Sequence, residues 1–69
     1  MIKDWQQYQE LDDLVWQAED RLNTGQGASG VHYVLMYALR NLGIFANGRE
    51  DTITQGKKLL KEFEEAQRI

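Results

Sequence analysis

The sequence contains no cysteine and only one histidine, His32, in 69 residues. A disulfide and a thiolate zinc site are therefore excluded, and one imidazole cannot make a metal cluster. A chain of this length buries only about 60% of the surface that it exposes when unfolded, so small scaffolds usually need a cross-link. Packing or oligomerisation has to supply that stability here. The lack of cysteine also fits a reducing cytosol, where we expect the protein to act.

Groups for catalysis are scarce as well. Serine occurs only at Ser29, in a glycine-rich stretch, and no nucleophile stands beside a base in a recognisable pattern. His32 follows Ser29 by three residues, but a capping or surface role suits it better than catalysis. Carboxylates that share a helix face, such as Glu10 and Asp13, lack the Glu-x-x-His partner of helical two-metal sites. We therefore expect no enzymatic activity, no cofactor and no bound metal.

Basic residues are fewer than acidic ones, which gives the chain a formal net charge of -3. Proteins that bind nucleic acids normally carry a basic surplus, so the balance argues mildly against that class. Residues 1–5, MIKDW, have no apolar run behind the lone lysine, which argues against a secretory signal. The most apolar stretch is shorter than the roughly 18 residues of a membrane span and contains Arg40 and Asn41. These features predict a soluble cytosolic protein.

The chain does have one strongly apolar stretch, residues 31–46, VHYVLMYALRNLGIFA. At about 3.6 residues per turn, its apolar side chains form a broad stripe that is typical of a core helix. The members of this stripe are Val31, Val34, Leu35, Ala38, Leu39, Leu42 and Phe45. The opposite side carries further large side chains around a lone arginine, namely Tyr33, Met36, Tyr37, Ile44 and Arg40. The stretch therefore has more apolar surface than one neighbouring helix can cover.

Residues 3–23 contain no glycine or proline and predict one long helix of about five to six turns, with Asp4 as its cap. Its core stripe consists of Tyr8, Leu11, Leu14, Val15, Ala18 and Leu22. Trp5 and Trp16 are 11 residues apart and align at one edge, beside Asp12. In one interpretation both rings fold over the edge of the core, which we favour for Trp16. In the other they form a strip that binds a partner.

Residues 23–30, NTGQGASG, predict the loop to the second helix, with Ser29 or Gly30 as the helix cap. Gly25, Gly27 and Gly30 have the G-x-G-x-x-G spacing of a dinucleotide-binding loop. Such a site requires a preceding strand, however, and here a helix is predicted instead. The sequence therefore indicates a plain glycine-rich turn.

The second helix is predicted to end at residue 42 in a Schellman motif, with Gly43 in the left-handed conformation and Ile44 folding back. Phe45 is expected beneath the corner formed by residues 43–48, which contains the Asn-Gly turn signal. The third helix should begin between residues 48 and 53. Two pairs have capping-box spacing there: Asn47 with Glu50, and Thr52 with Gln55.

The third helix has a core stripe made of Ile53, Leu59, Leu60, Phe63 and Ala66. Gly56 lies on the same face, where it marks either a close helix contact or a late helix start. Opposite charges four residues apart, such as Glu64 and Arg68, predict a solvated outer face.

These patterns predict an all-α fold in a single domain, residues 1–69, with helices at about 3–23, 30–42 and 49–68 and an apolar central helix between its neighbours. The excess of apolar surface predicts a small protein–protein interaction module that acts as an accessory, regulatory or inhibitory protein, for instance an adaptor. The candidate partner-binding residues are Tyr33, Met36, Tyr37, Arg40, Trp5, Asp12 and Trp16.

The side of the central helix that carries Tyr33 and Tyr37 is expected to be covered by a second copy of the chain, as in a two-fold homodimer. Arg40 would then reach Asp12 or Asp13 of its mate. The alternative is that the first and third helices wrap the central helix and cover these side chains within one chain.

A helix-turn-helix regulator that binds nucleic acid is the second functional hypothesis, with residues 43–48 as the turn. Its recognition helix would present Thr52, Thr54, Gln55, Lys57, Lys58 and Lys61. Acidic residues on the same element, among them Glu50 and Glu62, argue against it.

Overall fold

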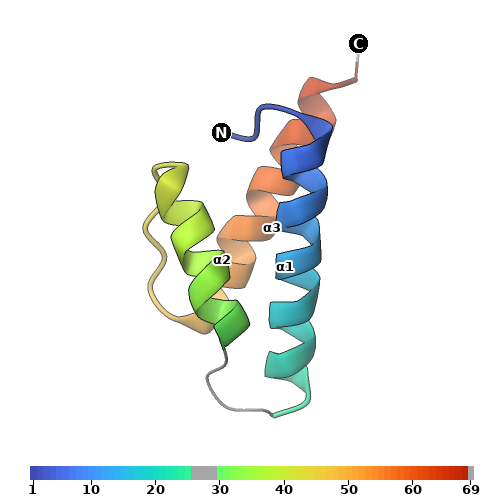
Figure 1. Ribbon diagram of the computed structural model, residues 1–69. Coiled ribbons are helices and arrows are strands. Elements are labelled where there is room, and N and C mark those ends of the chain that lie inside the picture. Colours follow the sequence, from blue (N-terminus) through green and yellow to red (C-terminus); the bar gives the residue numbers. More distant parts are fainter. Residues whose placement is uncertain (26–29, 69) are drawn as a thin grey trace.

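The structure, a computed structural model, describes residues 1–25 and 30–68. It has three helices, α1 (Trp5–Asn23), α2 (Gly30–Asn41) and α3 (Arg49–Ala66), and no strand within the described ranges. The predicted all-α class is therefore confirmed, and the predicted helix ends agree with the observed ones to within two residues. Figure 1 shows α1 and α3 as long neighbours and α2 as a shorter helix beside them.

Local hydrogen bonds explain why α1 begins where it does. The side chain of Asp4 accepts a hydrogen bond from the backbone N–H of Gln7 at 2.8 Å, which satisfies one of the free donors of the first turn, as predicted. At the other end the backbone N–H of Thr24 donates to the carbonyl oxygen of Asp20 at 3.0 Å. Gly25 then leaves the helix with φ at 72°. Both ends of α1 are therefore capped by hydrogen bonds between neighbouring residues of the chain.

The predicted Schellman motif closes α2. The N–H of Ile44 donates to the carbonyl of Leu39 at 2.9 Å, and the N–H of Gly43 donates to that of Arg40 at 2.9 Å. Gly43 has φ at 85°, a conformation that side-chain-bearing residues rarely adopt. Ile44 folds back and packs against the core. The motif turns the chain sharply toward α3.

The start of α3 differs from both predicted capping boxes. Gly48 is the N-cap and offers no side chain. Instead, the carboxylate of Asp51 accepts a hydrogen bond from the N–H of Asn47 at 2.8 Å. The hydroxyl of Thr52 donates to the carbonyl oxygen of Gly48 at 2.6 Å. Thr52 therefore lies inside the first turn, where its hydroxyl is satisfied by the backbone, and does not cap the helix.

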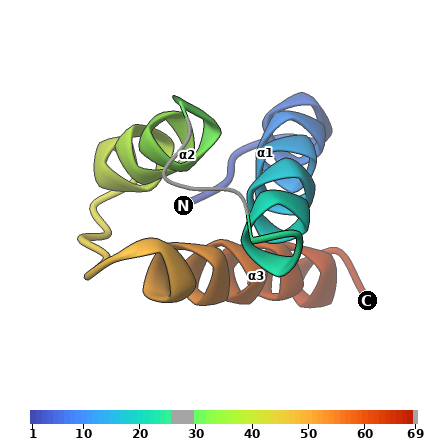
Figure 2. The same cartoon turned by 90° about the horizontal axis from the view of Figure 1, so that it is seen from below.

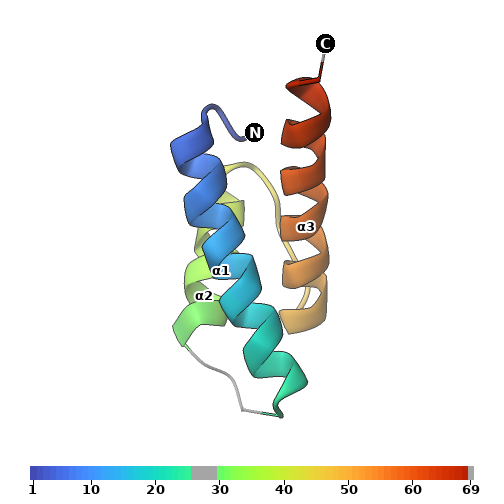
Figure 3. The same ribbon diagram turned by 90° about the vertical axis from the view of Figure 1, so that its right-hand side faces the viewer.

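All three helices contact one another, so the helix that is central in sequence is not central in space. Viewed along the bundle in Figure 2, α1 and α2 lie side by side and α3 passes across both, and Figure 3 shows α3 beside the α1–α2 pair. The buried apolar core consists of Ile2, Leu11, Val15, Ala18, Leu35, Leu39, Ile53, Leu59, Leu60 and Phe63. Because α1 packs directly on α3, one side of α2 has no neighbour among the residues that the structure describes.

Gly56 of α3 packs closely against Val15 of α1. A β-carbon at this position would be 2.6 Å from Cγ2 of Val15, which is closer than two carbon atoms can approach. The glycine is buried in the middle of α3, so the predicted close helix contact is confirmed and the late helix start is wrong. The absence of a side chain allows the two backbones to approach.

The buried face of α2 is narrower than the predicted stripe. Leu35 and Leu39 are fully buried, as predicted, but Val34 is 53% exposed and Phe45 lies in solvent at the corner. His32, expected at the surface, is only 2% exposed. The positions around the helix axis explain this difference. His32 precedes Leu35 by three residues and Leu39 by seven, so it lies on the same face of α2. Val34 lies about 100° around the helix from Leu35 and is therefore outside that face.

Candidate functional site

The free side of α2 and the segment that follows it form an aromatic surface, which we call the α2 surface. It consists of Tyr33, Val34, Tyr37, Arg40 and Phe45. The exposed fractions of its aromatic side chains are 56% for Tyr33, 61% for Tyr37 and 73% for Phe45. Neither α1 nor α3 covers them, so the expectation that these helices wrap α2 within one chain is wrong. Met36, predicted to be on this face, is half-buried at its margin.

Arg40 organises the α2 surface. Its guanidinium carbon lies 5.7 Å from the ring centroid of Tyr37 and 5.6 Å from that of Phe45, within the range of cation–π attraction. Tyr37 is one turn before Arg40, and the Schellman turn at Gly43 brings the chain back so that Phe45 reaches the same guanidinium. Phe45 therefore lies against an exposed arginine at the surface, and the prediction that it lies beneath the corner is wrong.

The size of the α2 surface is relevant to its role. An aromatic side chain presents about 150–250 Å² when fully exposed, so the three rings together leave roughly 400 Å² open to solvent. The largest apolar patch on a typical monomer covers about 300–600 Å² and is often functional. Tyrosine, phenylalanine and arginine are also types that are enriched in protein interfaces. The surface therefore has residue types that are enriched in protein interfaces and the size of the largest apolar patch on a typical monomer.

The second group of candidate residues, Trp5, Asp12 and Trp16, lies on α1. The ring of Trp5 makes edge contacts with Tyr8 at 5.1 Å and with Phe63 at 4.8 Å between centroids, so it covers the edge of the core. Trp16 does not. It is 71% exposed, which overturns the interpretation of this ring as structural. The two tryptophans share an edge of α1, yet only one of them packs against the core.

These two groups face different sides of the protein. Glu19, one turn after Trp16, forms an ion pair with Lys57 of α3, so the Trp16 edge of α1 is its α3 side. The other side of α1 faces α2 across a groove lined by Leu14 and Ala38. The candidate residues predicted from sequence are thus brought together as two separate surfaces and not as one.

One hydrogen bond between α1 and α3 was not predicted from the sequence. The hydroxyl of Tyr8 donates to a carboxylate oxygen of Glu64 at 2.5 Å. This bond, together with burial and the negative charges of Glu64 and Asp12, raises the pKa of Tyr8 to about 12. The sequence assigned Tyr8 to the core stripe and Glu64 to the solvated face. No local spacing could have linked them, because they lie 56 positions apart.

The glycine-rich stretch between α1 and α2 lies partly outside the described residues, which include neither Gly27 nor Ser29. Gly25 follows a helix, whereas a dinucleotide site requires a preceding strand.

Within residues 1–25 and 30–68, no three histidine or acidic side chains come together in a way that could hold a metal ion. In the same ranges α2 is too short to cross a membrane, and the longer helices are too polar.

No protein-family model matches the chain, and the comparisons with curated proteins and with solved structures found no match either. The function of the protein therefore has to be inferred from its own residues.

Proposed function

We propose that this protein is a small cytosolic protein–protein interaction module that acts as an accessory, regulatory or inhibitory protein, and that the α2 surface is its binding face. The observation that carries the proposal is the exposed stack of Arg40 with Tyr37 and Phe45. An arginine in contact with two rings has less side-chain freedom than a free one, so a partner that binds there has less to order. The proposed location in the cytosol comes from the sequence.

The simplest occupant of the α2 surface is a second copy of the chain. Tyr33, Tyr37 and Arg40 follow one another at intervals of about one turn, so a two-fold axis near Tyr37 places each Arg40 opposite the Tyr33 end of its mate. Arginine over tyrosine is a favourable contact in that arrangement. Asp12, one of the two partners of Arg40 expected from sequence, is less suitable because it lies on the α3 side of α1, where it acts on Tyr8.

The area of the surface predicts a modest affinity. A stable specific interface buries about 800 Å² per partner, and the exposed rings supply roughly half of that. Val34, Met36 and the stem of Arg40 would contribute more. We therefore expect a dimer that forms at micromolar concentrations and dissociates on dilution.

Sedimentation over a range of concentrations tests this proposal. Wild-type protein is expected to form a dimer, and Tyr37→Lys to be monomeric because a charge replaces the central ring. The matched control is Trp16→Lys, which makes the same kind of change at an exposed ring outside the α2 surface and should leave the dimer intact. A wild-type protein that stays monomeric at high concentration would exclude the second copy as the occupant. A loss of thermal stability in Tyr37→Lys, measured at a dilution at which the wild type is also monomeric, would show that the ring is structural.

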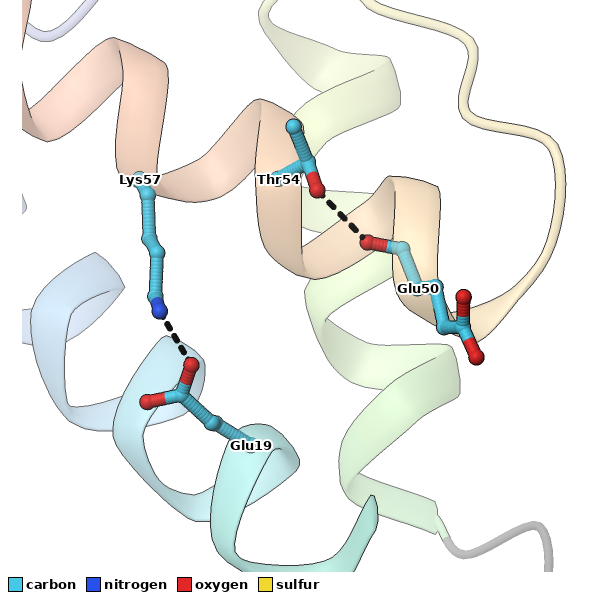
Figure 4. Close-up of polar contacts among 4 residues, drawn as sticks. All are labelled: Glu19, Glu50, Thr54 and Lys57. Carbon is cyan, nitrogen blue, oxygen red and sulfur yellow. Dashed lines mark hydrogen bonds and ion pairs between the residues drawn. The ribbon is translucent and has the colours of Figure 1, made fainter. Parts of the chain in front are cut away.

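Contacts within the chain weaken the alternative of a helix-turn-helix regulator. Figure 4 shows that Lys57 forms an ion pair with Glu19 of α1 and that the hydroxyl of Thr54 donates to the carbonyl oxygen of Glu50. Thr52 is fully buried. Several side chains of the supposed recognition helix are therefore engaged within the protein. A mobility shift on random duplex DNA that weakens as salt rises would revive this alternative, because phosphate contacts depend strongly on salt.

A further inference from the structure

Trp16 is an exposed ring with acidic residues around it on α1. On a helix, the nearest surface neighbours of a residue are those three and four positions away. For Trp16 these are carboxylates in every direction: Asp12, Asp13, Glu19 and Asp20. No lysine or arginine occupies any of these positions, although α1 contains one arginine elsewhere. A large indole is thus flanked by carboxylates on the α3 side of α1, and one of them, Glu19, is paired with Lys57.

The neighbouring carboxylates are not all equally available. Glu19 is paired with Lys57, as Figure 4 shows, and Asp13 accepts a hydrogen bond from the side-chain amide of Gln17 at 2.8 Å. Asp12 and Asp20 are exposed. They lie one turn before and one turn after the indole. We call Trp16, Asp12 and Asp20 the Trp16 face.

The chemistry of the Trp16 face selects a cation. The face of an indole attracts a positive charge more strongly than that of any other side chain, and guanidinium groups stack on it most often. A planar guanidinium that lies on the ring still has N–H groups at its edge, which can donate to a carboxylate beside the ring. A compact ammonium makes either contact less well. The arrangement therefore favours arginine over lysine and rejects acidic or neutral groups.

We propose that the Trp16 face binds an arginine-bearing segment of another protein. The charge of the face and the exposure of its ring argue for this partner. Trp5 extends the same edge, because 11 residues of helix separate the two indoles by about 16 Å. The ring of Trp5 contacts the rings of Tyr8 and Phe63, so this end is apolar. An extended partner segment advances about 3.3 Å per residue, so an apolar side chain about five residues from the arginine reaches Trp5.

This surface is distinct from the α2 surface. It lies on the α3 side of α1, whereas α2 packs on the other side, so one copy can hold both partners. An adaptor needs two such faces. Failure of dimerisation through α2 would leave the proposal for the Trp16 face unaffected, and the reverse also holds.

Nuclear magnetic resonance with synthetic peptides tests the proposal. The probe is a short extended peptide that carries two arginines and a leucine about five residues away. Matched peptides replace both arginines with lysine or with glutamine. The arginine peptide is expected to shift the indole N–H signal of Trp16, and to a smaller extent that of Trp5. Its affinity should exceed that of the lysine peptide and should fall as the salt concentration rises, because exposed charges are screened. A Trp16 signal that stays unchanged, or that shifts equally with the glutamine peptide, would overturn the proposal.

Substitutions separate a specific site from a general attraction to an acidic protein. Trp16→Ser should lower the affinity about five-fold or more, and Asp20→Asn about two-fold or more. Glu10→Gln is the matched control, since it removes the same charge from the α2 side of α1, where Glu10 lines the groove. It should leave binding unchanged. Circular dichroism should show that all three variants remain folded. Equal losses in Glu10→Gln and Asp20→Asn would mean that only net charge attracts the peptide, and the proposal would then be wrong.

Discussion

The hydroxyl of Tyr8 and the carboxylate of Glu64 form a hydrogen bond of 2.5 Å that joins α1 to α3. This bond holds the proton on the phenol, because a phenolate would face the negative charge of Glu64. It lies beside the aromatic cluster of Tyr8 with Trp5 and Phe63. The end of the bundle at which the first residues of the chain meet α3 is thus held by both polar and aromatic contacts.

The first prediction concerns alkaline pH. The pKa of Tyr8 is raised from 10.0 to about 12 in the folded protein, so the bond stabilises the fold fully below pH 10 and is lost as the pH rises toward 12. Tyr8→Phe should cost about 1 kcal/mol near neutral pH, since the partly exposed bond is weakened by solvent. The difference in unfolding free energy between wild type and Tyr8→Phe should disappear over that pH range. Titration of Tyr8 near pH 10 would contradict the prediction.

The second prediction concerns Gly56. Replacing a helical glycine by alanine normally stabilises a helix by about 1 kcal/mol. Here the new methyl group would meet Val15, whose branched side chain is buried and has little freedom to move. Overpacking of this kind costs about 1–3 kcal/mol and outweighs that gain, so Gly56→Ala should be destabilising by up to about 2 kcal/mol in a denaturant titration.

Two further variants define the cause of that effect. Gly30→Ala is the matched control, because a β-carbon at the start of α2 meets nothing within 4 Å. It should be neutral or slightly stabilising. Val15→Ala combined with Gly56→Ala should cost less than the sum of the single changes, because the smaller side chain makes room for the methyl group. Additive costs would show that the clash is not the cause.

The third prediction separates the buried face of α2 from its exposed side. Leu39→Ala should destabilise the protein by about 2–5 kcal/mol, which is enough to unfold a domain of this size, because Leu39 is fully buried. Val34→Ala should change the stability by less than about 0.5 kcal/mol. Thermal melts of the two variants measure the contrast. Similar losses in both would mean that the broad stripe expected from sequence was right.

The comparison of Val34 with His32 shows how much of the fold the sequence could predict. Apolar spacing placed three helices to within two residues, and glycines marked the Schellman turn and the close contact of α1 with α3. Spacing could not decide which part of the broad apolar stripe on α2 is buried. Hydropathy favours valine over histidine for the core, but the position of α1 and α3 determines which face is covered.

The candidate site was predictable in its residue types and not in its arrangement. Tyr33, Tyr37 and Arg40 were identified because they lie opposite the core stripe of one helix. Phe45 was assigned to the core, since its apolar ring alone gave no sign that Arg40 would hold it at the surface. The exposure of Trp16 depends likewise on the path of α3, which the spacing within α1 does not reveal.

The last prediction concerns Phe45, whose apolar ring is held at the surface. Phe45→Ser should leave the unfolding free energy unchanged to within about 0.5 kcal/mol, because the side chain is 73% exposed and makes its ring contact with an exposed arginine. It should nevertheless weaken self-association about five-fold or more in sedimentation, since a large aromatic anchor is removed from the α2 surface. Leu42→Ser is an informative contrast three residues earlier, where the side chain is half-buried against the core. That variant should lose stability. If Phe45→Ser lowers the melting temperature as much as Leu42→Ser does, the ring belongs to the core and the α2 surface ends at Arg40.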